Sequence, residues 1–198
     1  MHGLINRIIE RFVRDTYGRD VWGGIMQKLD LGYTEFEPML TYDKELTLHL
    51  LDEIAAALDK LLPDVLEDIG TYLVSHPNVE AVRRLLRFSG ENFVEFLYSL
   101  DDLPARAKLA VEDLHLPSLE LREHGANFYS VVIGAAPGNV AGFGHVVMGL
   151  LRTMADDYGA LVFLDYKGQR EGMEIVEVRV LEATFAEGRD FELGARAG

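Results

Sequence analysis

Residues 93–119 read FVEFLYSLDDLPARAKLAVEDLHLPSL, and this stretch decides the expected fold of the chain. It begins with an apolar helical pattern and then enters a Leu-Asp-Asp-Leu turn. Proline in a helix interior costs about 3 kcal/mol, but proline is well tolerated in the first turn of a helix. The stretch therefore predicts a break at residues 101–103, a new helix from Pro104 to about Leu114, and an exit at Pro117.

Before this stretch, the chain has the pattern of a helical unit. Apolar residues recur at helical spacing, and the polar-aromatic residues 33–42 are expected to form a loop. The helices predicted by this spacing and by start and stop residues are 4–17, 21–29, 44–58, 64–75, 80–88 and 92–100.

After the stretch the hydrophobic period changes, and strands are expected at 119–123 and 127–135. A helix over 142–158 and a hairpin of 160–167 with 173–183 follow. Helices first, and then an antiparallel sheet with one helix packed on it, indicate an α+β fold. We expect one domain.

The expected domain covers residues 1–186, with a helical part at 1–117 and a sheet-bearing part at 118–186. Residues 187–198 are expected to form a flexible tail after it.

Composition limits the partners and the chemistry. The chain is 48% hydrophobic and 26% charged, and its net charge of −14 disfavours a nucleic acid or an anionic membrane surface as partner. It has no cysteine, which excludes thiolate catalysis and Cys-based metal sites. Its apolar runs are far shorter than the roughly 20 residues of a spanning helix, so we expect no membrane insertion and a cytoplasmic location. The sequence shows no nucleophile–base pair of the kind that catalysis needs, so we do not expect an enzyme.

The central stretch resembles the H-NOX (HNOB) family of haem-based nitric oxide and oxygen sensor domains. The family pattern is close to L-D-x-L-H-x-R followed by P-S or P-A, and this chain has L-D-D-L-P-A-R and a later P-S. The opening MHGLIN, followed by F-V, Y-G and a Trp, is a second point of resemblance. Together they imply an H-NOX-like fold over almost the whole chain, to about residue 183.

The same resemblance places substitutions at the family's haem-binding positions. Pro104 stands where the family has the His that ligates iron. The propionate-binding Y-x-S-x-R motif falls on Ala136, Gly138 and Val140. A looser register from Phe128 retains a Ser, and neither register supplies an Arg, because no Lys or Arg occurs between Arg122 and Arg152.

A further departure is Glu112, where many members of the family have a proline packed under the haem.

The apolar box that encloses the haem in the family survives in residue type. The positions that would line it are Ile5, Ile9, Leu73, Leu100 and Met148. The alternative interpretation is that these are ordinary core residues. Among the histidines, His145 is the fallback ligand for iron, and His115 lies about 16 Å along a continuous helix from Pro104. No two histidines show metal-ligand spacing.

These observations favour a sensor or regulatory domain that has lost His-ligated haem, so no cofactor is expected. Its ligand would be an apolar, lipid-like molecule, by analogy with the distantly related vinyl-reductase-like and TRAPP-type domains. Its expected partner is a signalling protein such as a histidine kinase, a cyclase or a chemoreceptor. The alternatives are a haem sensor with a substitute ligand such as His145, and a ligand-free interaction domain.

Overall fold

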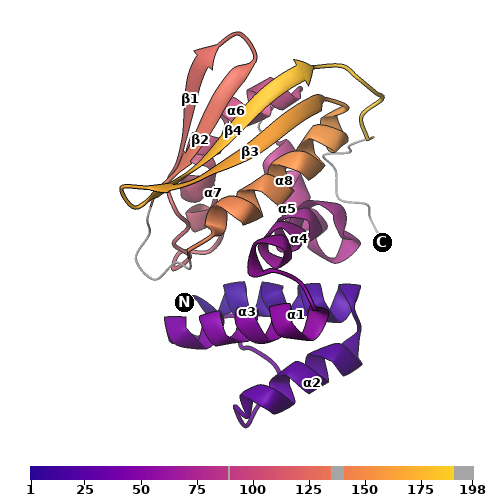
Figure 1. Cartoon of the computed structure of the whole chain (residues 1–198), viewed down its shortest axis with the longest axis vertical. Helices are drawn as coiled ribbons and strands as arrows, with labels where there is room; N and C mark the ends of the chain where they lie inside the picture. Colours follow the sequence, from indigo (N-terminus) through magenta and orange to yellow (C-terminus); the bar gives the residue numbers. More distant parts are fainter. Residues whose placement is uncertain (89, 135–140, 190–198) are drawn as a thin grey trace.

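A computed structural model describes residues 1–88, 90–134 and 141–189, and its helices precede its sheet (Figure 1). The helices are α1 Gly3–Thr16, α2 Arg19–Leu29, α3 Lys44–Leu58, α4 Leu62–Ser75, α5 Glu80–Arg87, α6 Phe93–Tyr98, α7 Leu103–Ala110 and α8 Phe143–Tyr158. The strands are β1 Leu119–Gly125, β2 Phe128–Ile133, β3 Leu161–Arg170 and β4 Met173–Glu182. Among the described residues, no helix is long and apolar enough to cross a membrane.

The strands form one antiparallel sheet in the order β1-β2-β4-β3. β4 pairs with both β2 and β3, so the last strand of the chain is inserted in the middle of the sheet. Val176, Val178 and Val180 alternate along β4 and are buried, which gives this strand one apolar face. Figure 1 shows α8 lying against the sheet on the side of the helical part, as the predicted α+β fold requires.

The interior is divided into two apolar clusters. One lies between the sheet and α6, α7 and α8, and includes Phe96, Leu100 and Val178. The other lies among α1, α2, α3 and α4, and includes Phe12 and Ile54. Helices α4 and α8 stand between the two clusters, so the seam between the two parts of the fold runs along them (Figure 1).

The predicted break before Pro104 is confirmed. Helix α6 ends at Tyr98, the 3-10 turn Leu100–Asp102 follows, and α7 begins at Leu103 with Pro104 in its first turn. The predicted end of α7 at about Leu114 is wrong, because the helix stops at Ala110.

The reason lies at Val111, whose extended backbone (φ −140°, ψ 99°) ends α7 and begins the segment 111–117. Four apolar residues of this segment, Val111, Leu114, Leu116 and Pro117, line an interior cavity, whereas Glu112, Asp113 and His115 are exposed. The helix therefore ends where the chain turns its apolar residues toward this cavity, and no Gly or Pro stands at Val111.

Candidate functional site

A large apolar cavity lies at the seam between the two clusters. Its volume is about 460 Å³, within the roughly 300–1,000 Å³ of small-molecule sites. Its wall is built by α1, α3, α4, α5, α7, the segment 111–117, β1 and α8. The described lining residues are Met1, Leu4, Ile5, Ile8, Ile9, Thr47, Leu51, Leu66, Ile69, Leu73, Ala81, Val82, Leu85, Leu86, Leu100, Leu103, Ala107, Ala110, Val111, Leu114, Leu116, Pro117, Leu119, Ala141, Phe143, Val146, Val147 and Leu150.

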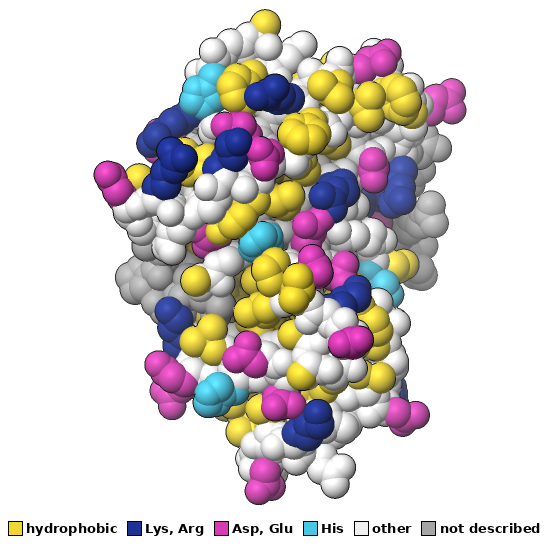
Figure 2. All heavy atoms as spheres, in the orientation of Figure 1, with side chains coloured by type: hydrophobic (Ala, Val, Ile, Leu, Met, Phe, Trp, Pro, Cys, Tyr) yellow, Lys and Arg dark blue, Asp and Glu magenta, His cyan; other side chains and the backbone are white. Residues whose placement is uncertain are grey.

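The chemistry of this wall is almost entirely hydrocarbon. Among the described lining residues no side chain is charged, and Thr47 carries the only hydroxyl. The Met1 thioether is a weak acceptor. Several lining side chains, including Leu4 and Ile8 of α1, are half-buried rather than buried, so the cavity reaches the surface there. In Figure 2, apolar side chains gather at the middle of the visible face, at the height where α1 and α3 meet the part above them in Figure 1.

Four of the five residues predicted to line a pocket lie in this wall. Ile5 and Ile9 come from α1, Leu73 from α4 and Leu100 from the turn before α7. Met148 of α8 is not among the lining residues, because its side chain is buried in the cluster beside the sheet.

Sequence reasoning missed the contributions of α5 and of the segment 111–117. The sequence predicted a helix over 80–88 but gave it no place in a pocket, although Val82, Leu85 and Leu86 recur at the spacing of one helical face. All three of these residues line the cavity. This spacing was the available signal for α5, whereas no local pattern placed Val111, Leu114, Leu116 and Pro117 in the cavity wall.

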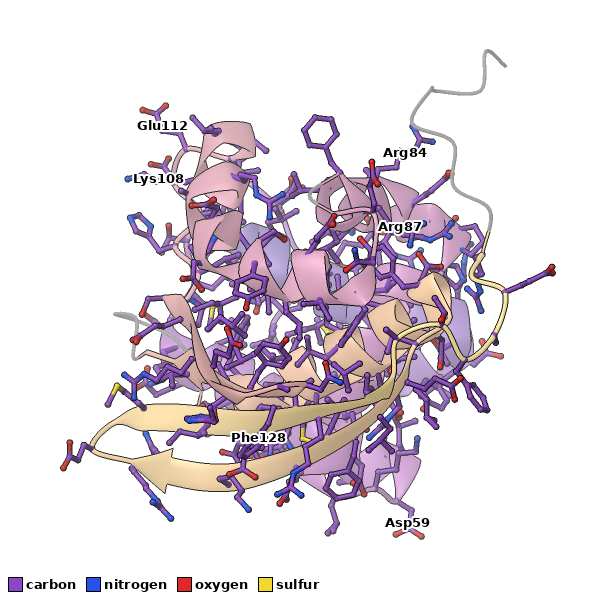
Figure 3. All side chains as sticks on the ribbon, turned by 90° about the horizontal axis from the view of Figure 1, so that it is seen from above. Asp59, Arg84, Arg87, Lys108, Glu112 and Phe128 are labelled. Atoms are coloured by element: carbon purple, nitrogen blue, oxygen red, sulfur yellow. The ribbon has the colours of Figure 1, made fainter. Side chains whose placement is uncertain are left out.

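Helix α7 presents an apolar face to the cavity, and Pro104 is not on it. Leu103 and Ala107 line the cavity, whereas Pro104 is half-buried and absent from the lining. Figure 3 shows the side chains of Lys108, near the end of α7, and of Glu112, just after it, pointing outward. Glu112, a position where the resemblance implies a proline under the haem, is therefore exposed.

The three positions expected for the propionate motif, Ala136, Gly138 and Val140, lie outside the described residues. In the looser register from Phe128, Ser130 bonds to the His124 ring across the β1–β2 hairpin (2.7 Å) and Val132 is buried in β2. Neither residue lines the cavity.

The fallback ligand His145 does not line the cavity either. Its ring packs on Tyr166 of β3, with centroids 4.1 Å apart, and burial lowers its pKa. His115 is exposed, and its Nδ1 lies 2.9 Å from the carbonyl oxygen of Asp113. Within the described residues, no group of three or more His, Asp or Glu could hold a metal ion.

The amino end of α8 is occupied by a carboxylate of the chain itself. Gly142 and Gly144 donate their backbone N–H groups to Glu174 of β4, each at 2.9 Å. Tyr166 donates its hydroxyl to the same carboxylate (2.8 Å), and burial with this bond raises the pKa of Tyr166 to about 12. Glu174 thus satisfies two N–H groups at a helix end that borders the cavity through Phe143.

A His-ligated haem needs an imidazole facing the ring and cations for two propionates. Within the described part of the chain, the cavity wall offers no imidazole and no Lys or Arg, and the sequence of residues 135–140 contains no His, Lys or Arg. The residues present therefore do not fit a haem held in that way.

Comparisons with known proteins agree with the fold. Residues 2–165 match the family described as Haem-NO-binding (HNOB). Soluble guanylate cyclase gcy-35 of Caenorhabditis elegans is 31% identical over 105 residues, 52% of this chain and 15% of the cyclase. Soluble guanylate cyclase 89Da of Drosophila melanogaster is 20% identical over 121 residues, 61% of this chain and 18% of the cyclase. The matched stretch thus spans less than a fifth of either cyclase.

Solved H-NOX structures have the same fold. The Fe(II) unliganded H-NOX protein of K. algicida covers 97% of this chain and 100% of its own, with a TM-score of 0.75 at 17% identity. The H-NOX protein of S. oneidensis in the Fe(II)NO state covers 92% of this chain and 100% of its own, with a TM-score of 0.74 at 16% identity. The family match covers most of the sequence and the structural likeness nearly all of it, and the chain belongs to the haem-NO-binding (H-NOX) family.

Proposed function

We propose that this chain is an H-NOX sensor domain that works without a His-ligated haem and holds an apolar small molecule in its cavity. H-NOX domains are sensor domains and are not catalytic themselves. The cyclase, histidine kinase or chemoreceptor that such a domain would regulate belongs to the proposal, with the cyclase class supported by the two relatives above.

The observation that carries the proposal is the size of the cavity together with its hydrocarbon wall. An enclosed, unfilled apolar void costs roughly 24 cal/mol per Å³, so 460 Å³ would cost on the order of 11 kcal/mol, an upper bound here because the cavity reaches the surface at Leu4 and Ile8. That is comparable with the whole stability of a domain, about 5–15 kcal/mol. A ligand that fills the space would offset this cost, which supports an occupied cavity.

The first test is an absorption spectrum of the protein expressed with excess haem precursor. We expect no Soret band, and native mass spectrometry should show a bound organic molecule that is released by denaturation. A stoichiometric Soret band would overturn the loss of His-ligated haem. A colourless protein that carries no small molecule and binds none would instead support a ligand-free interaction domain.

The second test places a larger side chain in the cavity by a substitution on α7. Ala107 of α7 lines the cavity, so Ala107→Phe should fill part of it and abolish ligand binding while the melting temperature of the ligand-free protein holds or rises. Ala105 on the same helix is exposed, and Ala105→Phe is the matched control that should bind like the unaltered protein. Equal binding by both variants, measured by mass spectrometry and thermal shift, would contradict the assignment of this cavity.

A further inference from the structure

We infer that the cavity takes a single-chain amphiphile with an anionic head group, whose alkyl chain fills the cavity and whose head group lies outside it against Arg11 of α1. The inference rests on the proposed function and adds the chemical class of the ligand and a residue that determines specificity. Three observations carry it: a groove that adjoins the cavity, two arginines in the wall of this groove, and the lack of a bonded partner for one of them among the described residues.

The groove lies on the surface beside α1. Its volume is about 260 Å³, and its described lining includes Leu4, Arg7, Ile8, Arg11, Glu35 and Glu37. Leu4 and Ile8 also line the apolar cavity, and both side chains are half-buried. The groove and the cavity therefore adjoin across these two side chains, at the place where the cavity reaches the surface.

Helical spacing brings apolar and cationic side chains together at this mouth. Leu4, Ile8 and Arg11 stand at positions i, i+4 and i+7 of α1, which is one face of a helix. Ile8 and Arg11 are separated by about 4.5 Å along the helix axis. An alkyl chain that passes over Ile8 into the cavity would thus leave its polar end within reach of the Arg11 guanidinium group.

Arg7 is already bonded to acidic side chains of the protein. Its Nη1 donates to Glu10 Oε1 (2.7 Å) and to Glu35 Oε2 (3.2 Å). Glu35 also accepts from Arg14 Nη1 (3.1 Å), so the charge of Glu35 is balanced within the chain. Arg7 and Glu35 therefore have their partners without a ligand.

Arg11 has no such partner. Within the described residues, its guanidinium group forms no hydrogen bond or ion pair, and its side chain is exposed. Asp15, one turn further along α1, attracts Arg11, but the Asp15 carboxylate is held by the Tyr72 hydroxyl (2.6 Å) and by Asn78 Nδ2 (2.9 Å). Because a guanidinium group binds a carboxylate through two parallel hydrogen bonds, Arg11 suits the head group of an anionic amphiphile.

Glu37 acts on the head group with the opposite sign. It lines the same groove, it is exposed, and it forms no ion pair with any described residue. Its charge repels an anion beside Arg11 and weakens the attraction. Removing either charge should therefore change the affinity for an anionic head group, in opposite directions.

The volume of the cavity sets the length of the alkyl chain. A cavity of about 150 Å³ lined by apolar side chains holds benzene. By that proportion, 460 Å³ holds roughly 18 non-hydrogen atoms at most. A dodecyl chain fits this space with its head group left outside.

The test uses three probes with one alkyl chain and different head groups: dodecanoate, dodecan-1-ol and dodecyltrimethylammonium. Each displaces a fluorescent apolar dye at pH 8, below its critical micelle concentration. The measured quantity is the ratio of the affinities for dodecanoate and dodecan-1-ol, in which the contribution of the shared chain cancels. In Arg11→Gln this ratio should fall about threefold to fivefold, as for an exposed ion pair, and Arg11→Lys should keep most of it. Glu37→Gln should raise the ratio.

Arg170→Gln is the matched control for net charge. Arg170 is exposed at the end of β3 and lines neither the groove nor the cavity, so its replacement should leave the ratio unchanged. Salt at about 1 M should lower the ratio for the unaltered protein, because it screens exposed charges. Arg11 is exposed as well, so Arg11→Gln should fold like the unaltered protein.

The outcomes separate this inference from the proposed function. Binding of none of the three probes would sink the proposed function itself. If dodecan-1-ol binds but Arg11→Gln and Arg170→Gln change the ratio equally, the cavity assignment stands and the assignment of the head group is overturned. Tightest binding of dodecyltrimethylammonium by the unaltered protein would overturn that assignment too.

Discussion

Replacing Gly149 with alanine is expected to lower the free energy of unfolding by about 3 kcal/mol, the upper range for overpacking. A Cβ built at Gly149 of α8 collides with the backbone carbonyl oxygen of Glu67 on α4. The facing contact is similar, because a Cβ at Gly70 of α4 collides with the carbonyl oxygen of Val146. Backbone atoms cannot rotate away, so the two helices would have to separate. For a chain of this size the melting temperature should fall by about 6–12 °C.

Gly24→Ala is the matched control. Gly24 lies inside α2, and a Cβ there meets no atom within 4 Å. Alanine favours a helix over glycine by about 0.5–1 kcal/mol, so this variant should be slightly more stable than the unaltered protein. If Gly149→Ala and Gly24→Ala shifted the melting temperature equally, the close approach of α4 and α8 would be refuted.

Replacing Arg83 with alanine is expected to cost about 3 kcal/mol. Arg83 of α5 donates from Nε and Nη2 to the carboxylate of Asp157 on α8, at 2.7–3.2 Å, and Asp157 is only 1% exposed. Removing one partner of a buried ion pair leaves an uncompensated charge, which typically costs about 3–5 kcal/mol. We expect the lower value because Arg87 Nε remains 3.9 Å from Asp157. Urea denaturation measures the change.

Arg84 on the same helix provides the control (Figure 3). It pairs with Glu80 at 3.1 Å, four residues away, and the Glu80 side chain is 54% exposed. Such surface pairs contribute about 0.3–0.5 kcal/mol, so Arg84→Ala should change stability little. Adding Asp157→Asn to Arg83→Ala removes the unpaired charge and should restore part of the loss. No recovery in the double variant would contradict the electrostatic explanation.

These two contacts also explain why the cavity keeps its shape. The glycine contacts hold α4 close to α8, and the Arg83–Asp157 pair ties α5 to α8. All three helices contribute lining residues, such as Leu66, Leu85 and Val147. The positions of these three helices, and with them the cavity wall, are therefore fixed by contacts between the helices outside the cavity.

Asp157 also contacts the end of the described chain. Its backbone carbonyl oxygen accepts a hydrogen bond from the backbone N–H of Arg189 (2.9 Å). Most of the expected tail, residues 190–198, lies outside the described residues, so its expected flexibility stays a prediction.

The secondary structure was largely predictable because its causes are local. Helical spacing of apolar residues found α1 through α6 and α8 with small errors at their ends, and alternation found the strands. Pro104 predicted the break before α7, since proline suits a first helical turn. The end of α7 was missed because no residue at Ala110 or Val111 is a helix stop, and the extended backbone at Val111 accompanies tertiary contacts of the following residues with the cavity wall.

The sequence by itself determined the order of helices and strands and the family resemblance. It also determined the residue types at the family's ligand positions, such as Pro104, because these depend on neighbours along the chain. Only the tertiary structure decided that α5 and the segment 111–117 join the cavity wall, and that Glu174 occupies the amino end of α8. These features join residues tens of positions apart, and their spacing depends on how closely whole helices approach, which no local pattern encodes.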